Sequence, residues 1–188
     1  MKKSFIRTVI FLFILASIVG CAQTVTTLTE DSDIIEPAKI SDTGYLLMAI
    51  DTSSTLQELH ISGEASLKLT SKDLRQGTNY ILLNVEAGNY TLDKIVISNF
   101  RVAEFNNEYW SFRIKPGAIN YIGEVYAHNV GWFDKTPRFE LVNNASMALE
   151  FMEDKFQNIL QSRKIIYAGP GEDNFFSLVD NVSKKASQ

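Results

Sequence analysis

Two apolar segments with the same order of residue types, both between Asn79 and Val130, constrain this chain more than any other feature of its sequence. The first runs over residues 80–100 and turns at Gly88, and the second runs over residues 109–126 and turns at Gly117. In each, a run rich in Val, Ile, Tyr, Phe and Trp is broken by glycine and resumes at a tyrosine, a pattern typical of antiparallel strands. We therefore predict a mainly β chain, an antiparallel β-sandwich built from these two hairpins.

The other apolar runs add strands to this prediction. Residues 44–50 are apolar throughout, so this strand should lie centrally or have its outer face covered. Residues 56–69 and 139–142 are further strand candidates, and a change of parity at residues 93–94 predicts a β-bulge. In the strand after Gly117, alternation predicts that one face carries Ile122, Glu124 and Tyr126 and the other carries Tyr121, Gly123 and Val125.

In residues 144–163, apolar residues recur every three or four positions instead of every two. This spacing predicts one amphipathic C-terminal helix with Asn143 or Asn144 as its N-cap, packed on a sheet face or a sandwich edge. A helix that binds a partner through its apolar stripe is the alternative. Residues 174–182 favour a second short helix, and residues 183–188 are expected to form a tail. With two helices, an α+β class by count stays open.

The first residues have the pattern of a signal peptide. Lys2, Lys3 and Arg7 precede an apolar run over residues 9–19. A membrane-spanning helix needs roughly 20 apolar residues, so this run is too short to span and fits the apolar region of a secretory signal. We therefore assign residues 1–20 to a signal peptide and exclude them from the fold.

The run ends in Ile18-Val19-Gly20-Cys21, which resembles the lipobox of bacterial lipoproteins. The resemblance implies cleavage between Gly20 and Cys21 and attachment of diacylglycerol and fatty acyl chains such as palmitate at Cys21. It also implies a cell-envelope location, the periplasmic face of the outer membrane in a Gram-negative host, because Ala22 follows the cysteine. An ordinary secretory signal with an incidental cysteine is the alternative. As Cys21 is the only cysteine, no intramolecular disulfide can form.

Length and charge limit the domain organisation and the partners. Residues 21–188 fit one domain, which we place at residues 43–182, behind a lipidated, flexible tether at residues 21–42. The alternative for residues 34–40 is an edge strand of the sandwich. Without the three basic leader residues, 15 Lys and Arg oppose 22 Asp and Glu, a formal charge of −7. An acidic chain without a basic cluster argues against nucleic acid as a partner and makes the lipid anchor the expected link to the membrane.

The sequence carries no catalytic motif. With His60 and His128 as the only histidines, a histidine-rich metal site is excluded, and we predict no catalytic, metal-binding or cofactor-binding residues. His128 as a general base, and Glu124 with Asp134 as a glycosidase-type carboxylate pair, stay open as possibilities. Aromatic residues at 109–110 and 131–133 would suit glycan or protein recognition if exposed, but burial in the core is the favoured interpretation.

The two segments with turns at Gly88 and Gly117 also resemble the turns of carboxypeptidase-regulatory-like and other transthyretin-type β-sandwiches. This resemblance implies an accessory or binding module and no specific functional residues. We therefore expect a lipid-anchored envelope protein that binds or scaffolds an envelope protein or glycan. The alternatives are an envelope hydrolase and a lipoprotein inhibitor or immunity factor. An outward-projecting loop over residues 99–108 would favour the inhibitor.

Overall fold

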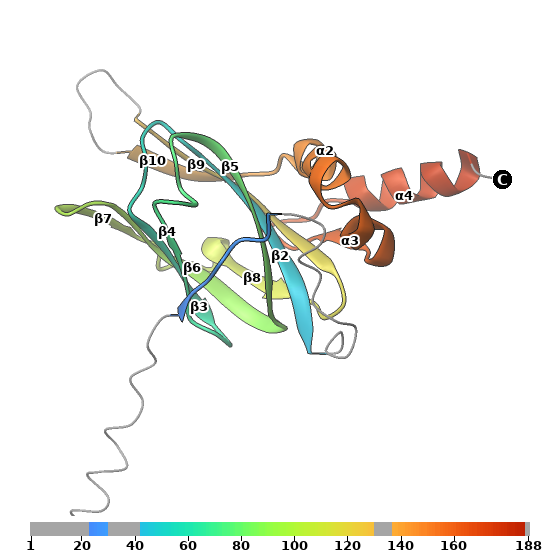
Figure 1. Cartoon of the computed structure of the whole chain (residues 1–188), viewed down its shortest axis with the longest axis horizontal. Helices are drawn as coiled ribbons and strands as arrows, with labels where there is room; N and C mark the ends of the chain where they lie inside the picture. Colours follow the sequence, from blue (N-terminus) through green and yellow to red (C-terminus); the bar gives the residue numbers. More distant parts are fainter. Residues whose placement is uncertain (1–22, 30–41, 130–136, 187–188) are drawn as a thin grey trace, which may run out of the picture.

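Two β-sheets face one another, and the helices lie beside the outer face of one sheet (Figure 1). The computed structural model of the chain describes residues 23–29, 42–129 and 137–186. Strands dominate the described residues, so the predicted mainly β class and the β-sandwich are confirmed.

Each sheet combines strands that are distant in the sequence. The six-stranded sheet has the order β1 (Gln23–Thr24), β4 (Leu67–Thr70), β3 (Glu58–Gly63), β6 (Gly88–Ser98), β7 (Arg101–Glu104), with β8 (Ser111–Ile114) also beside β6. The five-stranded sheet has the order β10 (Pro137–Val142), β9 (Ile119–Asn129), β2 (Thr43–Thr52), β5 (Gly77–Glu86), with β11 (Ile165–Tyr167) also beside β9. Most pairs are antiparallel, and the parallel ones are β1–β4, β2–β9 and β9–β11.

Both segments predicted as hairpins are corners between the sheets, so that part of the prediction is wrong. β5 pairs with β2, whereas β6 pairs with strands of the other sheet, so the chain changes sheets at Ala87. The turn at Gly117, whose φ is +70°, likewise joins β8 of one sheet to β9 of the other. Turn residues show where a strand ends, but packing decides which strand it then pairs with. The hairpins in the six-stranded sheet are β3–β4 and β6–β7.

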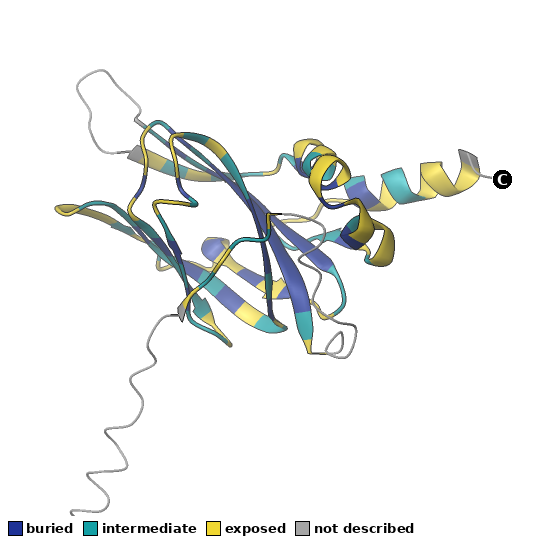
Figure 2. Cartoon of the chain, in the orientation of Figure 1, coloured by how far each residue is buried: buried dark blue, intermediate teal, exposed yellow. Residues whose placement is uncertain are grey.

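The strand β2 is buried on both faces, as its continuous apolar run predicts. It lies between β5 and β9 in the five-stranded sheet. Leu46, Met48 and Ile50 join the core between the sheets. Tyr45 and Leu47 join a second core beneath the helices, and the dark strand in Figure 2 shows this double burial.

A β-bulge in β9 reverses the predicted faces of that strand from Glu124 onward. Between Tyr121 and Glu124 the pairing with β2 shifts by one residue. Gly123 lies in the bulge with a φ of +116°, a conformation that glycine adopts without steric cost. Glu124 therefore shares the outer face with Tyr121, whereas strict alternation placed them on opposite faces. The inner face carries Ile122 before the bulge and Val125 and Ala127 beyond it.

The predicted bulge in β6 is confirmed. Leu92 pairs with Ile61 of β3 and Lys94 pairs with the adjacent His60, so Asp93 is the extra residue. The freed Asp93 backbone carbonyl accepts a hydrogen bond from the Phe105 backbone N–H at 2.8 Å.

The predicted helix at 144–163 is two helices, α2 (Ala145–Lys155) and α3 (Gln157–Ser162). They are separated at Phe156, whose φ of −137° and ψ of 49° are not helical and whose side chain is buried. The apolar residues of both helices pack on the five-stranded sheet, in agreement with the packing interpretation. The second predicted helix is present as α4 (Phe175–Ala186), which continues through residues 183–186 that the sequence assigned to a tail.

Residues 23–29 lie on the sandwich, although the sequence assigned them to a flexible tether. After β1, the Val25 N–H donates to the Lys68 carbonyl at 3.1 Å. The Leu28 N–H then donates to the Leu82 carbonyl of β5 at 2.9 Å, so this segment links the edges of the two sheets. The signal peptide, Gly20, Cys21 and the possible edge strand at 34–40 lie outside the described residues.

Among the described residues, none of the helices combines the length and the apolar character needed to cross a membrane.

Candidate functional site

The outer face of the five-stranded sheet carries polar and aromatic side chains beside the start of α2. The register sets Glu124 and Tyr80 on either side of one β2 residue, and sets Tyr126 directly beside Asp51. The Tyr126 and His128 rings lie 5.4 Å apart, which extends the group toward the end of β9. We call this group the Glu124 face; it comprises Asp51, Tyr80, Glu124, Tyr126 and His128.

Glu124 is only 4% exposed, and its contacts tie the sheet to α2. The side-chain N–H of Asn144 donates a hydrogen bond to Glu124 Oε2, and the backbone N–H of Asn144 donates to Tyr121 Oη at 3.1 Å. Asn144 occupies the predicted N-cap position of α2, but its side chain does not cap the helix. A buried carboxyl group needs hydrogen-bond partners to offset lost hydration, and Asn144 supplies one here.

The tyrosines around Glu124 hold their protons more tightly than ordinary tyrosines. The negative charge of Glu124 is the main cause of the raised pKa of Tyr126. Burial is the main cause of the raised pKa of Tyr80 and Tyr121, and Glu124 adds to both. The Tyr80 ring also stacks on Phe151 of α2 at 4.6 Å, so helix packing fixes one side of the face.

His128 and Asp51 form the second side-chain contact of this face. His128 Nε2 lies 3.1 Å from Asp51 Oδ2, within ion-pair distance when the imidazole is protonated. The same nitrogen makes no well-aligned hydrogen bond, so the contact is one of charge and proximity rather than a directional hydrogen bond. The neighbours of His128 are thus a carboxylate and a phenol ring.

The Glu124 face is rich in hydrogen-bond acceptors and half-exposed aromatic surface. Carboxylates such as Asp51 and phenols such as Tyr126 accept hydrogen bonds from hydroxyl or ammonium groups, and aromatic faces also attract cations. The arrangement therefore suits a polyhydroxylated or positively charged ligand group. It brings together two of the sequence candidates, His128 and Glu124.

The other residues that the sequence suggested as candidates are buried, exposed, or outside the described residues. Asp134 and the aromatic residues at 131–133 lie outside the described residues. Trp110, at the end of a short 3₁₀ helix (Glu108–Trp110), is buried against Phe105, so the burial interpretation holds for it. Tyr109 is exposed, and its hydroxyl donates to the Leu141 carbonyl at 2.7 Å. In the described part of the chain no three His, Cys, Asp or Glu residues are grouped as metal ligands would be.

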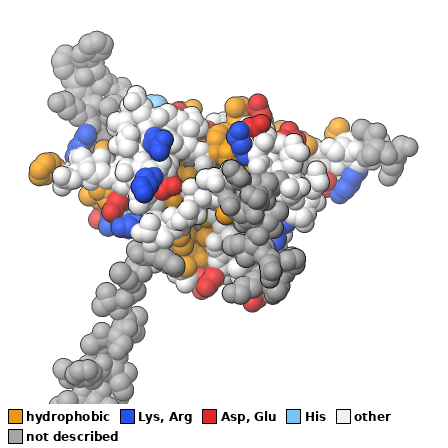
Figure 3. Space-filling view, viewed as in Figure 1, with side chains coloured by type: hydrophobic (Ala, Val, Ile, Leu, Met, Phe, Trp, Pro, Cys, Tyr) orange, Lys and Arg blue, Asp and Glu red, His pale blue; other side chains and the backbone are white. Residues whose placement is uncertain are grey.

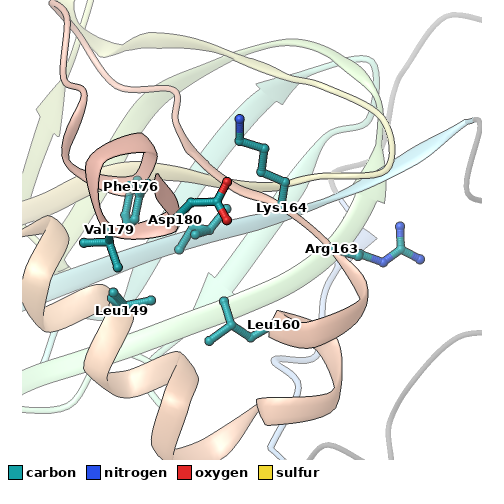
Figure 4. A pocket seen from close by; sticks show the side chains of 8 residues that line it. Leu149, Leu160, Arg163, Lys164, Phe176, Val179 and Asp180 are labelled. Carbon is teal, nitrogen blue, oxygen red and sulfur yellow. The ribbon is translucent and has the colours of Figure 1, made fainter. Parts of the chain in front are cut away.

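A small cavity lies between α2, α3, β11 and α4 (Figure 4). Its volume is about 160 Å³, below the roughly 300 Å³ at which small-molecule sites begin. Figure 4 shows that Lys164 and Arg163 point away from it, and the Arg163 guanidinium lies 5.1 Å from the centre of the Tyr45 ring. We therefore attribute the cavity to incomplete packing of α4; its apolar walls are Leu149, Leu160, Ile165, Phe176 and Val179.

Sequence reasoning missed Asp51, Tyr80 and the role of Asn144 in this face. Asp51 follows the apolar run of β2 and looks like part of a polar turn, and Tyr80 looks like the start of a core strand. Only the pairing of β2 with both β5 and β9 places these residues beside Glu124. Nothing in the local sequence signals that pairing.

The fold and this face define the chain as a two-sheet β-sandwich with a polar, aromatic outer face next to its C-terminal helices. No protein-family model matches the chain, and no curated protein or solved structure matches it either.

We expect the stability of the fold to fall at alkaline pH. The pKa of Tyr80, Tyr90, Tyr121, Tyr126 and Tyr167 is raised above the ordinary value of 10.0. The folded state therefore keeps protons that the unfolded chain releases, so this stability is fully present below about pH 10 and is lost as the pH rises through the folded-state pKa values. Urea unfolding between pH 8 and pH 11 measures the effect, and a constant midpoint would contradict it.

Replacing Glu124 tests how far its charge raises the pKa of Tyr126. Because the charge of Glu124 is the main cause at Tyr126, Glu124→Gln should lower the pKa of Tyr126. Tyr90 is the internal control, since its pKa is raised by burial, with Glu86 and Glu64 as the nearby charges. Nuclear magnetic resonance titration of the tyrosine ring carbons separates the two residues.

Proposed function

We propose that the chain is a lipid-anchored protein of a bacterial cell envelope whose β-sandwich binds or scaffolds another envelope component. The acyl chains are attached at Cys21 after cleavage behind Gly20. In a Gram-negative host, Ala22 directs the protein to the periplasmic face of the outer membrane. The partner is an envelope protein or a glycan, and the protein needs no cofactor for this role.

The observation that carries the proposal is the position of β1 relative to Cys21. β1 begins at Gln23, two residues after Cys21, and is paired with β4. Two residues of extended chain reach about 7 Å. An acyl group on Cys21 therefore holds the sandwich close to the membrane, with the start of β1 facing it. This is a stronger constraint on orientation than a flexible tether of about 20 residues would give.

The Glu124 face supports a binding role in preference to hydrolysis. His128 contacts Asp51 and Tyr126, neither of which is a serine or cysteine nucleophile. The carboxylate of Glu124 is buried and accepts a hydrogen bond from Asn144. The acceptors that stay partly exposed are the Asp51 carboxylate and the Tyr126 phenol. Partly exposed acceptors beside an aromatic ring bind ligand hydroxyl or ammonium groups without making or breaking a covalent bond.

The anchor is tested by metabolic labelling with a fatty-acid analogue. The wild type should carry the label and sediment with membranes, whereas Cys21→Ser should carry none and appear in the soluble fraction. Ala22→Ser is the matched control, because it changes the adjacent position and keeps the thiol. Equal labelling of the wild type and Cys21→Ser would end the proposal.

An inhibitor or immunity factor is the second candidate, and one observation favours it. The β6–β7 hairpin projects from the sandwich and carries an exposed phenylalanine at its turn (Figure 1). This is the kind of outward loop with which an inhibitor enters a cleft of its target. The candidate keeps the same anchor and differs only in what the bound partner does.

A further inference from the structure

Phe100 is the most exposed of the large hydrophobic side chains in the described part of the protein, at 95%. It lies in the turn between β6 and β7, and Val102 beside it is 53% exposed. Figure 3 shows hydrophobic side-chain atoms at the end of the projecting hairpin. Single apolar residues are common on protein surfaces, so exposure alone does not define a site. The hairpin is also held rigidly at its base and projects in a defined direction.

The base of the hairpin is fixed from both sides. The Gln57 backbone N–H donates to the Val96 carbonyl at 2.8 Å, and the Gln57 side chain donates to Asn99 Oδ1 at 2.9 Å. On the β7 side, the Phe105 backbone N–H donates to the Asp93 carbonyl at 2.8 Å. The Phe105 ring packs 4.2 Å from Trp110. A turn held in this way loses little conformational entropy when it binds, because it is already ordered.

The hairpin points in the direction in which β1 runs into the sheet, away from the side from which the chain enters. Gln23 of β1 pairs with Leu67, Leu67 pairs with Ile61, and Ile61 pairs with Leu92 of β6. β1 and β6 run in the same direction, because β1 is parallel to β4 and two antiparallel steps lead from β4 to β6. From Leu92, β6 runs on to Ser98, about 20 Å further along the sheet at roughly 3.3 Å per residue. Phe100 therefore lies at the end of the six-stranded sheet remote from Gln23.

We propose that the β6–β7 turn, residues 99–102, is a docking contact for a second envelope protein, with the Phe100 side chain seated in an apolar pocket of that protein. The inference rests on the proposed anchor for its choice of occupant. If Cys21 is acylated, the chain runs from the membrane into β1 in the same direction in which β6 leads to the turn. The turn therefore points away from the lipid bilayer, which is not its binding surface. The phenylalanine ring offers apolar surface with no hydroxyl or amide to satisfy, and an apolar protein pocket matches such a side chain.

The Glu124 face lies toward the same end of the molecule. β2 ends at Thr52, which pairs with Ala127 of β9, and the chain then passes through Gln57 to the base of the hairpin. His128 and Asp51 are thus near the end from which the turn projects. Both lie on the outer face of the five-stranded sheet, so a partner at the turn reaches this polar surface only if it also extends across to that sheet.

Photo-crosslinking in the envelope of cells that make the full chain tests the proposal. Phe100→p-benzoylphenylalanine places the reactive group at the turn, and Met147→p-benzoylphenylalanine, at an exposed apolar position on α2, is the matched control. We expect one discrete protein adduct from position 100 that position 147 does not give. The protein in that adduct is identified by mass spectrometry, purified and titrated with the wild type, Phe100→Ser and Met147→Ser. Phe100→Ser should bind it about 10-fold to 100-fold more weakly, and Met147→Ser equally well.

The other outcomes overturn the docking contact. No adduct, an adduct with lipid only, a crosslinked dimer of the chain itself, or equal binding by Phe100→Ser would each contradict it. A Phe100-dependent association of the Cys21→Ser protein with phosphatidylethanolamine–phosphatidylglycerol vesicles would assign the turn to the bilayer instead. Fatty-acid labelling reports on the anchor separately. A specific protein adduct in cells where Cys21 carries no lipid would overturn the anchor and leave the docking contact standing.

Discussion

Replacing Asn120 by alanine is expected to cost about 3–5 kcal/mol of folding free energy, because it removes a fully buried side chain with four hydrogen bonds. Asn120 Oδ1 accepts from the Lys115 N–H at 2.9 Å. Its Nδ2 group donates to three carbonyls, those of Tyr45, Lys115 and Ala118, at 3.1–3.2 Å. These bonds hold the corner between β8 and β9 against the start of β2, and alanine would remove the acceptor of the Lys115 N–H together with the amide's contacts to the three carbonyls.

The midpoint of urea unfolding measures this loss. Asn106→Ala is the matched control, since Asn106 is exposed in the loop before the 3₁₀ helix and should change stability by about 0.5 kcal/mol or less. Asn120→Asp gives a second test, because a carboxylate there would face the carbonyl oxygens that the amide now contacts. Its stability relative to the wild type should improve as the pH falls and the new side chain is protonated. An Asn120→Ala protein as stable as Asn106→Ala would show that the corner does not depend on this side chain.

Gly123→Ala is expected to cost about 2–4 kcal/mol, from backbone strain together with crowding. At φ +116° a side chain is strained in any surroundings. An added Cβ would also lie 3.1 Å from both Leu141 Cδ1 and the Val142 carbonyl oxygen of β10. Both effects act at the bulge that places Glu124 on the outer face.

Gly77→Ala separates the two effects. Gly77 has a φ of +96°, and a Cβ there would meet no atom within 4 Å, so only backbone strain remains, about 1–2 kcal/mol. The difference between the two variants in urea unfolding measures the crowding at β10. Equal losses for Gly77→Ala and Gly123→Ala would mean that Leu141 and Val142 move aside without cost.

Most of the strands could be predicted because they carry their own signal, whereas β1 and β7 lie in segments assigned to a tether and a loop. The continuous apolar run of β2 predicted burial on both faces, and the parity change at residues 93–94 predicted the bulge of β6. Pro116 and Gly117 predicted a turn, which is present with Gly117 at φ +70°. These features depend on residues close together in the chain, so local preferences and alternation are sufficient to identify them.

The candidate site could be predicted only in part. Glu124 and His128 are unusual residues in an apolar strand and were identified as candidates. Their partners Asp51 and Asn144 come from other elements, and no spacing in the sequence connects them. Helix continuity through residues 144–163 was also predicted wrongly, because the break at Phe156 accompanies burial of its ring among residues of several elements.

The sequence by itself determined most of the strands, the helical character of the C-terminal segments, and that no disulfide within the chain can stabilise them. The tertiary structure alone decided that Ala87 and Gly117 are corners between sheets rather than hairpin turns. It alone decided that Glu124 faces outward, because a single extra residue at Gly123 inverts every side chain after it. The physical reason is that alternation records only that a strand has two faces. Which face is buried, and against which strand, depends on the packing of segments far apart in the chain.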